Sequence, residues 1–417
     1  MNHFERGPDG ALYAEGVPLS DIAEAVGTPT YVYSRATFTR HFTVFDAAWS
    51  DIDHLTCFAV KACSNLAVLQ LLSRLGAGFD IVSGGELARV LRAGCDPARV
   101  VFSGVGKTRA EMAAALEAGI LCFNVESAAE LDQLGQVAAQ VGTPAPVSLR
   151  VNPDVDPKTH PYISTGLKRN KFGVPWGDAL ALYRRAAASP HLDVVGLDFH
   201  IGSQLSDTGP LIEAIDRALE LVDALATEGI IIRHLDVGGG LGITYKEEAP
   251  PSPAEYAATL IDRVGDRALT VLTEPGRVIA GNAGVLLMRC LLTKVNGEHE
   301  FVVVDAGMND AIRPALYSAW HHIEPVAAPS QERRTVDVVG PVCESGDFFA
   351  RDRELPTVAE GDLLVLRSAG AYGFVMASTY NSRPRPAEVL VDGQRLHVVR
   401  PRETVEELLD GEILLDA

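Results

Sequence analysis

The feature that most constrains the fold of this chain is a regular alternation, between residues 55 and 273, of short apolar runs with longer segments of helical spacing. Strands that alternate with helices pair in parallel, because each helix carries the chain back to the edge where the next strand begins. We count eight such runs, at residues 55–60, 78–82, 99–103, 120–125, 147–151, 194–199, 231–237 and 269–273. Eight strands predict a closed (β/α)8 TIM-type barrel with its helices outside.

The rhythm changes after about residue 284, where strand-like runs follow one another without long helices. These runs lie at residues 301–304, 335–339, 363–366, 388–391 and 396–399. They predict an α/β plus all-β chain, with an antiparallel β-barrel or β-sandwich as the second domain. Asp392-Gly393 signals a hairpin, but Gln394-Arg395 follows it, so we expect a longer loop there.

We place the barrel domain at residues 31–283 and the β domain at residues 284–417, the latter joined by the N-terminal segment 1–30. A chain of 417 residues exceeds the usual size of one hydrophobic core, which also favours two domains.

Charge and apolar content exclude several classes of function. The net charge of −19 gives the chain no global attraction for nucleic acid or anionic membranes. The start of the sequence lacks the regions of a signal peptide, and no apolar run approaches the ~18 residues that span a bilayer. We therefore expect a cytoplasmic protein. The six cysteines show no CxxC spacing, so neither a metal site nor a disulfide framework is predicted, and several should fill the core.

Polar side chains follow the apolar strands at the point where each predicted strand ends. They are Lys61, Asp80, Ser103, Asn124, Arg150, His200, Gly238 to Gly240 and Glu274. Catalytic groups gather at these ends in TIM-type barrels, so one pocket could collect them all. The alternative is ordinary loop polarity, since turns favour Gly, Asn, Asp and Ser, and for Ser103 and Asn124 we favour that alternative.

Two of these residues suggest a cofactor. Lys61 ends an apolar strand, where a desolvated amine becomes nucleophilic, although a lone strand-end lysine is more often solvated. Glu274 opens Glu274-Pro275-Gly276-Arg277 at the end of another strand. An amine that forms a Schiff base and a carboxylate that keeps a pyridinium protonated are what pyridoxal 5'-phosphate requires. The sequence thus predicts a pyridoxal-phosphate enzyme.

Two glycine-rich segments look like nucleotide motifs but do not match them. The P-loop pattern that ends in Lys107-Thr108 would need glycine at Val101, and the dinucleotide pattern that begins at Gly238 would need glycine at Ile243. Gly238-Gly239-Gly240 can still serve as a phosphate cradle, because residues without Cβ let backbone N–H groups approach a phosphate. A tight βα turn explains the same glycines equally well.

Other polar residues have a functional and a structural interpretation. The ring of His200 could stack on a flat cofactor while Ser203 donates to a phosphate, or His200 could be structural. Cys343 lies in a polar turn whose acidic residues favour the thiol form that a proton donor needs. Arg313 could hold a carboxylate in a bidentate fork or form a surface ion pair.

Six motifs in order make the chain resemble diaminopimelate decarboxylases, within the alanine racemase-like group that includes ornithine and arginine decarboxylases. The resemblance spans nearly the whole chain. The motifs are Phe58-Ala59-Val60-Lys61-Ala62, Ser83-Gly84-Gly85-Glu86-Leu87, His200-Ile201-Gly202-Ser203-Gln204, Asp236-Val237-Gly238-Gly239-Gly240-Leu241-Gly242, Glu274-Pro275-Gly276-Arg277 and Cys343-Glu344-Ser345-Gly346-Asp347.

The resemblance implies a pyridoxal-phosphate barrel joined to a β domain, in a homodimer whose active sites lie at the subunit interface. Lys61 and Cys343 would be catalytic, with Cys343 reaching the site from the partner subunit. The predicted cofactor-binding residues are Lys61, Asp80, Arg150, His200, Ser203, Gly239, Gly240, Glu274, Gly276, Arg277 and Tyr372. The predicted substrate-binding residues are Arg277, Arg313, Tyr317, Glu344 and Tyr372.

The activity that the resemblance implies is decarboxylation of meso-2,6-diaminopimelate at its D-centre, which gives L-lysine and CO2 as the last step of lysine biosynthesis. Glu344 follows the cysteine, as in the diaminopimelate enzymes, where ornithine decarboxylases commonly have aspartate. The alternatives are a decarboxylase of ornithine, arginine or D-lysine, and a non-catalytic regulatory homologue. One departure from the family pattern is Cys63, where the family often has asparagine.

Overall fold

The computed structural model describes residues 2–153, 155, 171–205 and 207–415. The chain forms two compact units, one of residues 40–244 and 248–279 and the other of residues 1–39, 245–247 and 280–417. α2 (Arg35–Ala47) and α10 (Arg277–Ala280) each contain a boundary between the units.

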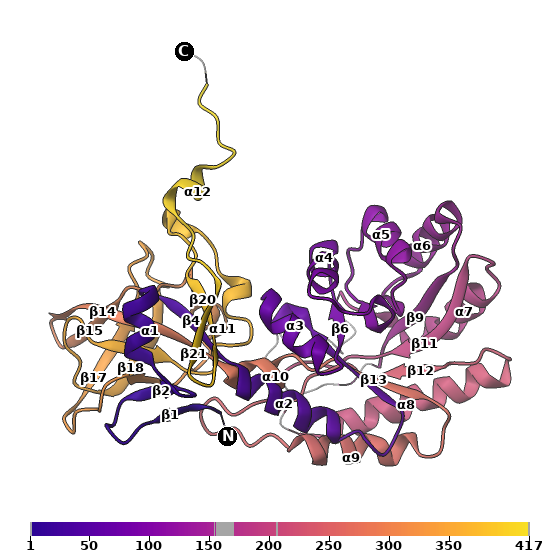
Figure 1. Ribbon diagram of the computed structural model, residues 1–417. Coiled ribbons are helices and arrows are strands. Elements are labelled where there is room, and N and C mark those ends of the chain that lie inside the picture. The colour runs from indigo at the N-terminus through magenta and orange to yellow at the C-terminus, as the bar shows by residue number, and fades with distance from the viewer. Residues whose placement is uncertain (1, 154, 156–170, 206, 416–417) are drawn as a thin grey trace. The chain divides into compact units, whose positions relative to one another are not determined.

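The first unit is built on a closed parallel barrel (Figure 1). Its strands are β5 (His54–Ala59), β6 (Gly78–Ile81), β7 (Val100–Phe102), β8 (Cys122–Val125), β9 (Ala145–Asn152), β11 (Leu192–Asp198), β12 (His234–Asp236) and β13 (Thr270–Thr273). Neighbours pair in parallel, and the pairs β13–β5 and β8–β9 close the ring. Each predicted run overlaps one of these strands, so the TIM-type barrel is confirmed. A short strand, β10 (Val174–Pro175), adds to β9.

Helices connect successive barrel strands. They are α3 (Leu66–Arg74), α4 (Gly84–Arg92), α5 (Arg109–Ala118), α6 (Ala128–Val141), α7 (Trp176–Ala187), α8 (Gly209–Thr227) and α9 (Pro253–Val264), with the 3-10 turns η1 (Val60–Ala62) and η2 (Pro97–Arg99). Several begin at a hydroxyl residue that accepts a backbone N–H: Ser83 caps α4, and Thr108 and Ser252 form capping boxes at α5 and α9. Thr108, from the segment that resembles a P-loop, thus starts a helix.

The inside of the barrel changes from apolar to polar along the strands. Side chains two residues apart point to the same face of a strand, so successive inward positions form layers. Leu55, Cys57, Val101, Cys122, Val195 and Leu272 form one buried apolar cluster. Two residues after members of this cluster come Ser103, Asn124 and Glu274, all buried. The amino-terminal half of the barrel is therefore hydrophobic core, and the carboxyl-terminal half is polar.

The second unit contains a mostly antiparallel sheet in the order β18-β17-β15-β14-β4-β20-β21, with β19 paired to β14 and β16. Its strands are β4 (Thr30–Ser34), β14 (Gly284–Asn296), β15 (His299–Val304), β16 (Ile323–Pro325), β17 (Arg333–Val339), β18 (Phe348–Pro356), β19 (Leu363–Leu366), β20 (Ala387–Asp392) and β21 (Arg395–Arg400). The predicted second, antiparallel β domain is confirmed, although β15–β17 and β20–β4 pair in parallel.

The same unit includes the N-terminal strands β1 (Phe4–Arg6), β2 (Leu12–Ala14) and β3 (Val17–Pro18), and the helices α1 (Leu19–Val26), α11 (Arg313–Tyr317) and α12 (Val405–Leu409). Short 3-10 turns are η4 (Gly281–Ala283), η5 (Phe374–Met376) and η6 (Tyr380–Ser382). None of the helices in the described part of the chain has the length and apolar character needed to cross a bilayer.

The expectation of a longer loop after Asp392 is wrong. Asp392 pairs directly with Arg395, so β20 and β21 are joined by a two-residue turn of Gly393 and Gln394. Gly393 has φ +61°, a conformation that glycine adopts without steric cost and that allows the tight turn.

Gly196 in β11 tests the packing of the barrel. A Cβ at Gly196 would lie 2.0 Å from Nε2 of His234, whose ring is buried and held 3.6 Å from Sγ of Cys122. Since the ring cannot move away cheaply, we expect Gly196→Ala to lower the free energy of unfolding by about 1–3 kcal/mol in urea denaturation.

The matched control is Gly135→Ala in α6, where a Cβ would make ordinary contact with Leu192 at 3.9 Å. It should raise the free energy of unfolding by about 0.5–1 kcal/mol, because alanine favours a helix interior. Equal effects of the two substitutions would contradict this account of the packing around Gly196.

Candidate active site

Lys61 lies just past the carboxyl end of β5, in η1, and contacts an acid on the next strand. Its Nζ donates to Oδ2 of Asp80 at 2.5 Å. Asp80 is fully buried, and its other oxygen, Oδ1, has no hydrogen-bond partner among the described residues. The pair holds an amine at the mouth of the barrel and leaves one buried carboxylate oxygen available to another donor.

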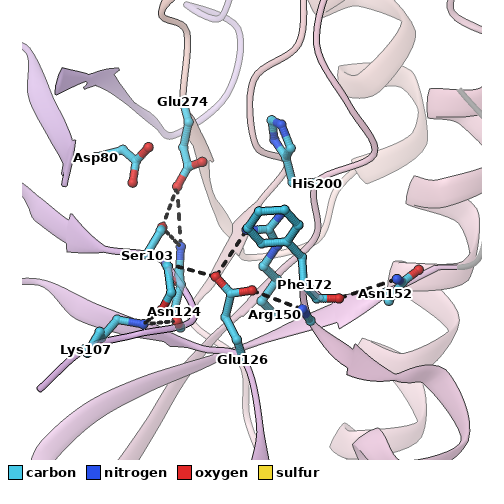
Figure 2. Close-up of polar contacts among 12 residues, drawn as sticks. Asp80, Ser103, Lys107, Asn124, Glu126, Arg150, Asn152, Phe172, His200 and Glu274 are labelled. Atoms are coloured by element: carbon cyan, nitrogen blue, oxygen red, sulfur yellow. Dashed lines mark hydrogen bonds and ion pairs between the residues drawn. The ribbon is translucent and has the colours of Figure 1, made fainter. Parts of the chain in front are cut away.

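Glu274 follows β13 and is buried, at 6% exposure. Its Oε1 accepts from the hydroxyl of Ser103 at 3.3 Å and from Nδ2 of Asn124 at 3.4 Å (Figure 2). Our interpretation of Ser103 and Asn124 as ordinary loop polarity is therefore wrong. Both side chains point into the barrel, because they occupy the inward positions at the carboxyl ends of β7 and β8.

Acidic groups gather around Glu274, and two of them, Asp198 and Asp236, were not predicted as site residues. Burial, followed by repulsion from Asp236 and Asp80, raises the pKa of Glu274 well above its usual range. Burial and Asp198 raise the pKa of Asp236 to about 8, and burial also raises the pKa of Asp198. Each of these acids ends an apolar strand, a signal that could have identified them. Such a cluster favours a cationic group nearby.

Arg150 supplies positive charge from β9. Its Nη1 lies 3.3 Å from Oε1 of Glu126, and its guanidinium lies over the ring of Phe172, 4.8 Å from the ring centre. Burial alone would lower the pKa of Arg150, but Glu126, Asp198 and Glu274 outweigh it and raise that pKa. Arg150 therefore stays charged among the acids.

Lys107 belongs to the segment that resembles a P-loop, and its side chain is fully buried beneath the same network. Its Nζ donates to the carbonyls of Gly104 and Asn124, at 2.7 and 2.8 Å, and to Oε1 of Glu130 at 2.7 Å. The three protons of the ammonium are thus matched by three acceptors. Lys107 is a structural cation, in keeping with the absence of a P-loop.

The glycine turn after β12 lies against His200 and Glu274. Gly238 and Gly240 have φ of +66° and +109°, and a Cβ at Gly239 would lie 2.2 Å from the carbonyl oxygen of Glu274. The backbone N–H of Gly239 donates to Nδ1 of His200 at 3.2 Å. Both the backbone conformation and the close approach therefore require glycine.

His200 is neutral in this environment. Burial, followed by the positive charges of Arg150 and Lys61, lowers its pKa well below the usual range. A neutral ring that accepts a hydrogen bond through Nδ1 offers a flat face without a charge. Nearby, Nη2 of Arg277, a buried residue, donates to Oγ of Ser203 at 3.2 Å, and Gly276 lies in the buried turn between β13 and α10.

The other predicted site residues lie in the second unit. Arg313 begins α11 and is buried, and its Nη1 donates to Oη of Tyr245 at 2.8 Å. Nε2 of His321 lies 3.2 Å from the same nitrogen, while Nδ1 of His321 donates to the Arg367 carbonyl at 2.8 Å. This tautomer lets Nε2 accept from Arg313, so the guanidinium is held from two sides.

Cys343 is exposed, whereas the other five cysteines are buried. Its backbone N–H donates to Oδ1 of Asn381 at 2.8 Å. Asp347 anchors the loop from inside, because its carboxylate accepts the backbone N–H groups of Met308 and Val342, each at 2.6 Å. The loop therefore presents the thiol and the neighbouring Glu344, also exposed, to the outside of the unit.

Tyr317 and Tyr372 are both partly buried within this unit. Tyr317 ends α11, four residues after Arg313, so the two side chains share one face of the helix. Tyr372 has φ +55°, an uncommon value for a residue with a Cβ.

The geometry thus defines two groups of residues. In the barrel, an amine, a neutral imidazole, a glycine turn and a buried carboxylate surround the carboxyl ends of the strands. In the second unit, an exposed thiol lies on a loop and a buried guanidinium lies at the start of α11. The amine can bond a carbonyl compound. The buried carboxylate can hold a protonated ring nitrogen.

Comparisons with known proteins agree with this chemistry. The family model "Pyridoxal-dependent decarboxylase, pyridoxal binding domain" matches residues 35–281. Diaminopimelate decarboxylase of Pseudomonas aeruginosa is 60% identical, and that of Vibrio cholerae 57%, each over 98% of this chain and 98% of the relative. The crystal structure of diaminopimelate decarboxylase from Helicobacter pylori complexed with L-lysine has a TM-score of 0.91 and 43% identity, covering 94% of this chain and 98% of that one.

Asp236 gives the cofactor-free protein a predictable pH dependence. Its pKa is about 8 in the folded state against an ordinary value of 3.8, so between these values the folded state binds a proton that the unfolded state lacks. The free energy of unfolding must therefore fall as pH rises through this window. Asp236→Asn cannot ionise, so its stability relative to the parent should rise by about 3–4 kcal/mol between pH 5 and pH 8.

Urea denaturation of the two cofactor-free proteins at pH 5, 6.5 and 8 measures this difference directly. A difference that stays constant across the three pH values would show that Asp236 is ionised throughout.

Proposed function

The chain belongs to the diaminopimelate decarboxylase family of pyridoxal-dependent decarboxylases, and from that premise we propose that it converts meso-2,6-diaminopimelate to L-lysine and CO2. Decarboxylation would occur at the D-centre, as the last step of lysine biosynthesis. The observation that carries the proposal is the match to the Pseudomonas aeruginosa enzyme, 60% identical over 98% of both chains. The barrel geometry supplies the chemistry that this match requires.

The residues at the mouth of the barrel fit pyridoxal phosphate. The cluster of Asp198, Asp236 and Glu274, with raised pKa values, favours a cationic ligand group such as a protonated pyridine nitrogen. Oδ1 of Asp80 is a buried acceptor without a described donor. The turn at Gly239 and Gly240 provides a backbone surface that a side chain would fill.

Each barrel residue then has a role toward the cofactor. Lys61 would hold it covalently through its amine, and His200 would lie on the face of its ring. The remaining contacts would come from Asp80, Arg150, Ser203, Gly239, Gly240, Glu274, Gly276 and Arg277, and from Tyr372, which belongs to the second unit. When bound, pyridoxal phosphate supplies a ring that accepts an electron pair from the α-carbon of an amino acid.

Glu274 would face the ring nitrogen and stabilise its proton. A buried carboxylate is worth more in this role than a neutral partner, because the low dielectric of the interior strengthens its interaction with a cation. Burial thus has two effects on Glu274. Without the cofactor it raises the pKa of the carboxyl group, and with the cofactor it strengthens the interaction of the carboxylate with the protonated ring nitrogen.

The chain must also supply a proton after CO2 leaves. The bond between the α-carbon and the carboxylate carbon breaks, and the electron pair stays with the α-carbon. The thiol of Cys343 would then transfer its proton to that carbon, which forms the C–H bond, and the thiolate would recover a proton from water. Exposure of the loop that carries Cys343 allows the thiol to serve an active site outside its own unit.

The distal end of the substrate carries a carboxylate and an ammonium. We assign the carboxylate to Arg313, which is pre-oriented by Tyr245 and His321, and the ammonium to Glu344. Arg277, Tyr317 and Tyr372 complete the predicted set. A simple diamine lacks the distal carboxylate that Arg313 would bind.

The assembly and location are part of the proposal. We propose a homodimer with active sites at the subunit interface, in which Cys343 serves the barrel of the partner, and we place the protein in the cytoplasm. The division into a barrel domain of residues 31–283 and a β domain of residues 284–417, joined by residues 1–30, belongs to the same proposal. Six free thiols are compatible with a reducing compartment.

The direct test is to mix purified protein and pyridoxal phosphate with meso-diaminopimelate and to measure CO2 together with the chirality of any lysine. We expect equal amounts of CO2 and L-lysine. Lys61→Ala should abolish both turnover and the absorbance of covalently held cofactor.

Parallel assays with ornithine, arginine and D-lysine separate the alternatives. Faster turnover of one of them would move the assignment to that substrate. Failure of every substrate with cofactor-loaded protein would favour the non-catalytic homologue instead.

Mixing two inactive variants tests the shared site. If Lys61 and Cys343 act across subunits, a dimer of one Lys61→Ala chain and one Cys343→Ala chain contains one intact site and one doubly defective site. Random re-association of equal amounts should therefore restore about a quarter of the parent activity, because half of the dimers are mixed. No recovery, with size measurements that confirm mixed dimers, would show that both residues act within one chain.

A further inference from the structure

We propose that Asn124 is a positioning residue: its carboxamide, together with the hydroxyl of Ser103, holds the carboxylate of Glu274 toward the cofactor ring nitrogen and keeps it apart from Asp236. The inference deepens the proposed function and rests on one part of it, the binding of pyridoxal phosphate with Glu274 at the ring nitrogen. It does not depend on which amino acid is decarboxylated.

The carboxamide of Asn124 lies between the two acids. Its Nδ2 is 3.3 Å from Oδ2 of Asp236, 3.4 Å from Oε1 of Glu274 and 3.2 Å from Oγ of Ser103. A carboxamide nitrogen has two protons for these three acceptors. Ser103 resolves the shortage, because it can accept from Asn124 and donate its own proton to Glu274 at 3.3 Å.

The orientation of the carboxamide follows from its surroundings. Oδ1 of Asn124 lies 3.8 Å from Sγ of Cys122, a thiol that can donate to it. The reverse orientation would place a carbonyl oxygen against the carboxylates of Asp236 and Glu274 and would remove both N–H donors of Asn124 from the network. The nitrogen must therefore face the acids.

The backbone of Asn124 is fixed as well. Its carbonyl accepts from Nζ of Lys107 at 2.8 Å (Figure 2). Lys107 is in turn paired with Glu130. The exposed fractions of Asn124 and Ser103 are 0% and 3%, so water cannot replace either donor. A buried ammonium thus supports the residue that orients Glu274, which gives the Gly104–Thr108 segment a purpose unrelated to nucleotides.

Several charged groups act on Glu274 from the surrounding strands. Asp80, Asp198 and Asp236 disfavour its ionisation from β6, β11 and β12. Lys61, from η1, and Arg150, from β9, favour it. The three acids oppose ionisation of Glu274, whereas the hydrogen bonds from Asn124 and Ser103 stabilise its ionised form. A protonated ring nitrogen requires that ionised carboxylate. Removal of these donors should shift Glu274 toward its protonated form.

The test is the affinity of the cofactor-free, full-length protein for pyridoxal phosphate, followed by absorbance and fluorescence between pH 6 and pH 9. For Asn124→Ala we expect the ratio of variant Kd to parent Kd to be about five to ten near pH 6.5, the effect of one typical hydrogen bond. The ratio should fall toward one as pH rises, because Glu274 then ionises in both proteins.

Two further variants keep the test decisive. Ser103→Ala should show the same pH-dependent ratio at smaller amplitude, and it serves if Asn124→Ala fails to fold. Ser148→Ala is the matched control, because Ser148 pairs with Asn124 in register across β8 and β9 and is fully buried. Its Oγ has no hydrogen-bond partner among the described residues, so its ratio should stay near one at every pH.

A ratio for Asn124→Ala that is near one, or raised equally at all pH values, would overturn the proposal, since a loosened pocket weakens binding without regard to the charge of Glu274. The outcome is separate from that of the proposed function. A parent protein that binds the cofactor but does not decarboxylate diaminopimelate leaves the inference testable, whereas a parent that does not bind the cofactor refutes both.

Discussion

The concentration of buried carboxylates at one end of the barrel is the constraint on which the rest of the site depends. Asp80, Asp198, Asp236 and Glu274 are each at most 6% exposed. Ionised acids cannot be buried together without compensation, and the structure provides it through Arg150, Lys61 and the neutral donors of Ser103 and Asn124. The compensation remains incomplete, as the raised pKa values show, and this makes the end of the barrel a site for a cationic ring nitrogen.

The apolar half of the barrel makes this polar half possible. Leu55, Val101, Leu272 and their neighbours form a conventional core at the amino-terminal ends of the strands. Burial of this apolar surface stabilises the fold and offsets the destabilising effect of the buried acids. Side chains two residues apart share a face, so the inward face of a strand can change from apolar core to polar site within two residues. In β13, Leu272 belongs to the apolar cluster, and Glu274, two residues later, belongs to the site.

Sequence patterns predicted the architecture well because they report directly on local geometry. Every barrel strand overlaps a predicted apolar run. Lys61 and Glu274 were identified because a charged residue at the end of a buried strand is costly without a purpose. Ser103 and Asn124 were misjudged, since their residue types are equally common in solvated turns. Their role depends on facing Glu274 across the barrel, a distance of 150 residues or more in the chain for each.

The sequence by itself determined the eight-stranded barrel, the second β domain and the amine and carboxylate that pyridoxal phosphate requires, because strand periodicity and strand-end charges are local properties of the chain. Only the tertiary structure decided which strand ends meet. It placed Lys107 in the interior as a structural cation. It also packed the ring of His234 against Gly196, where a Cβ would clash with it. It also brought Asn124 between two acids. These outcomes depend on the closure of the ring, which fixes distances between residues that no local pattern relates.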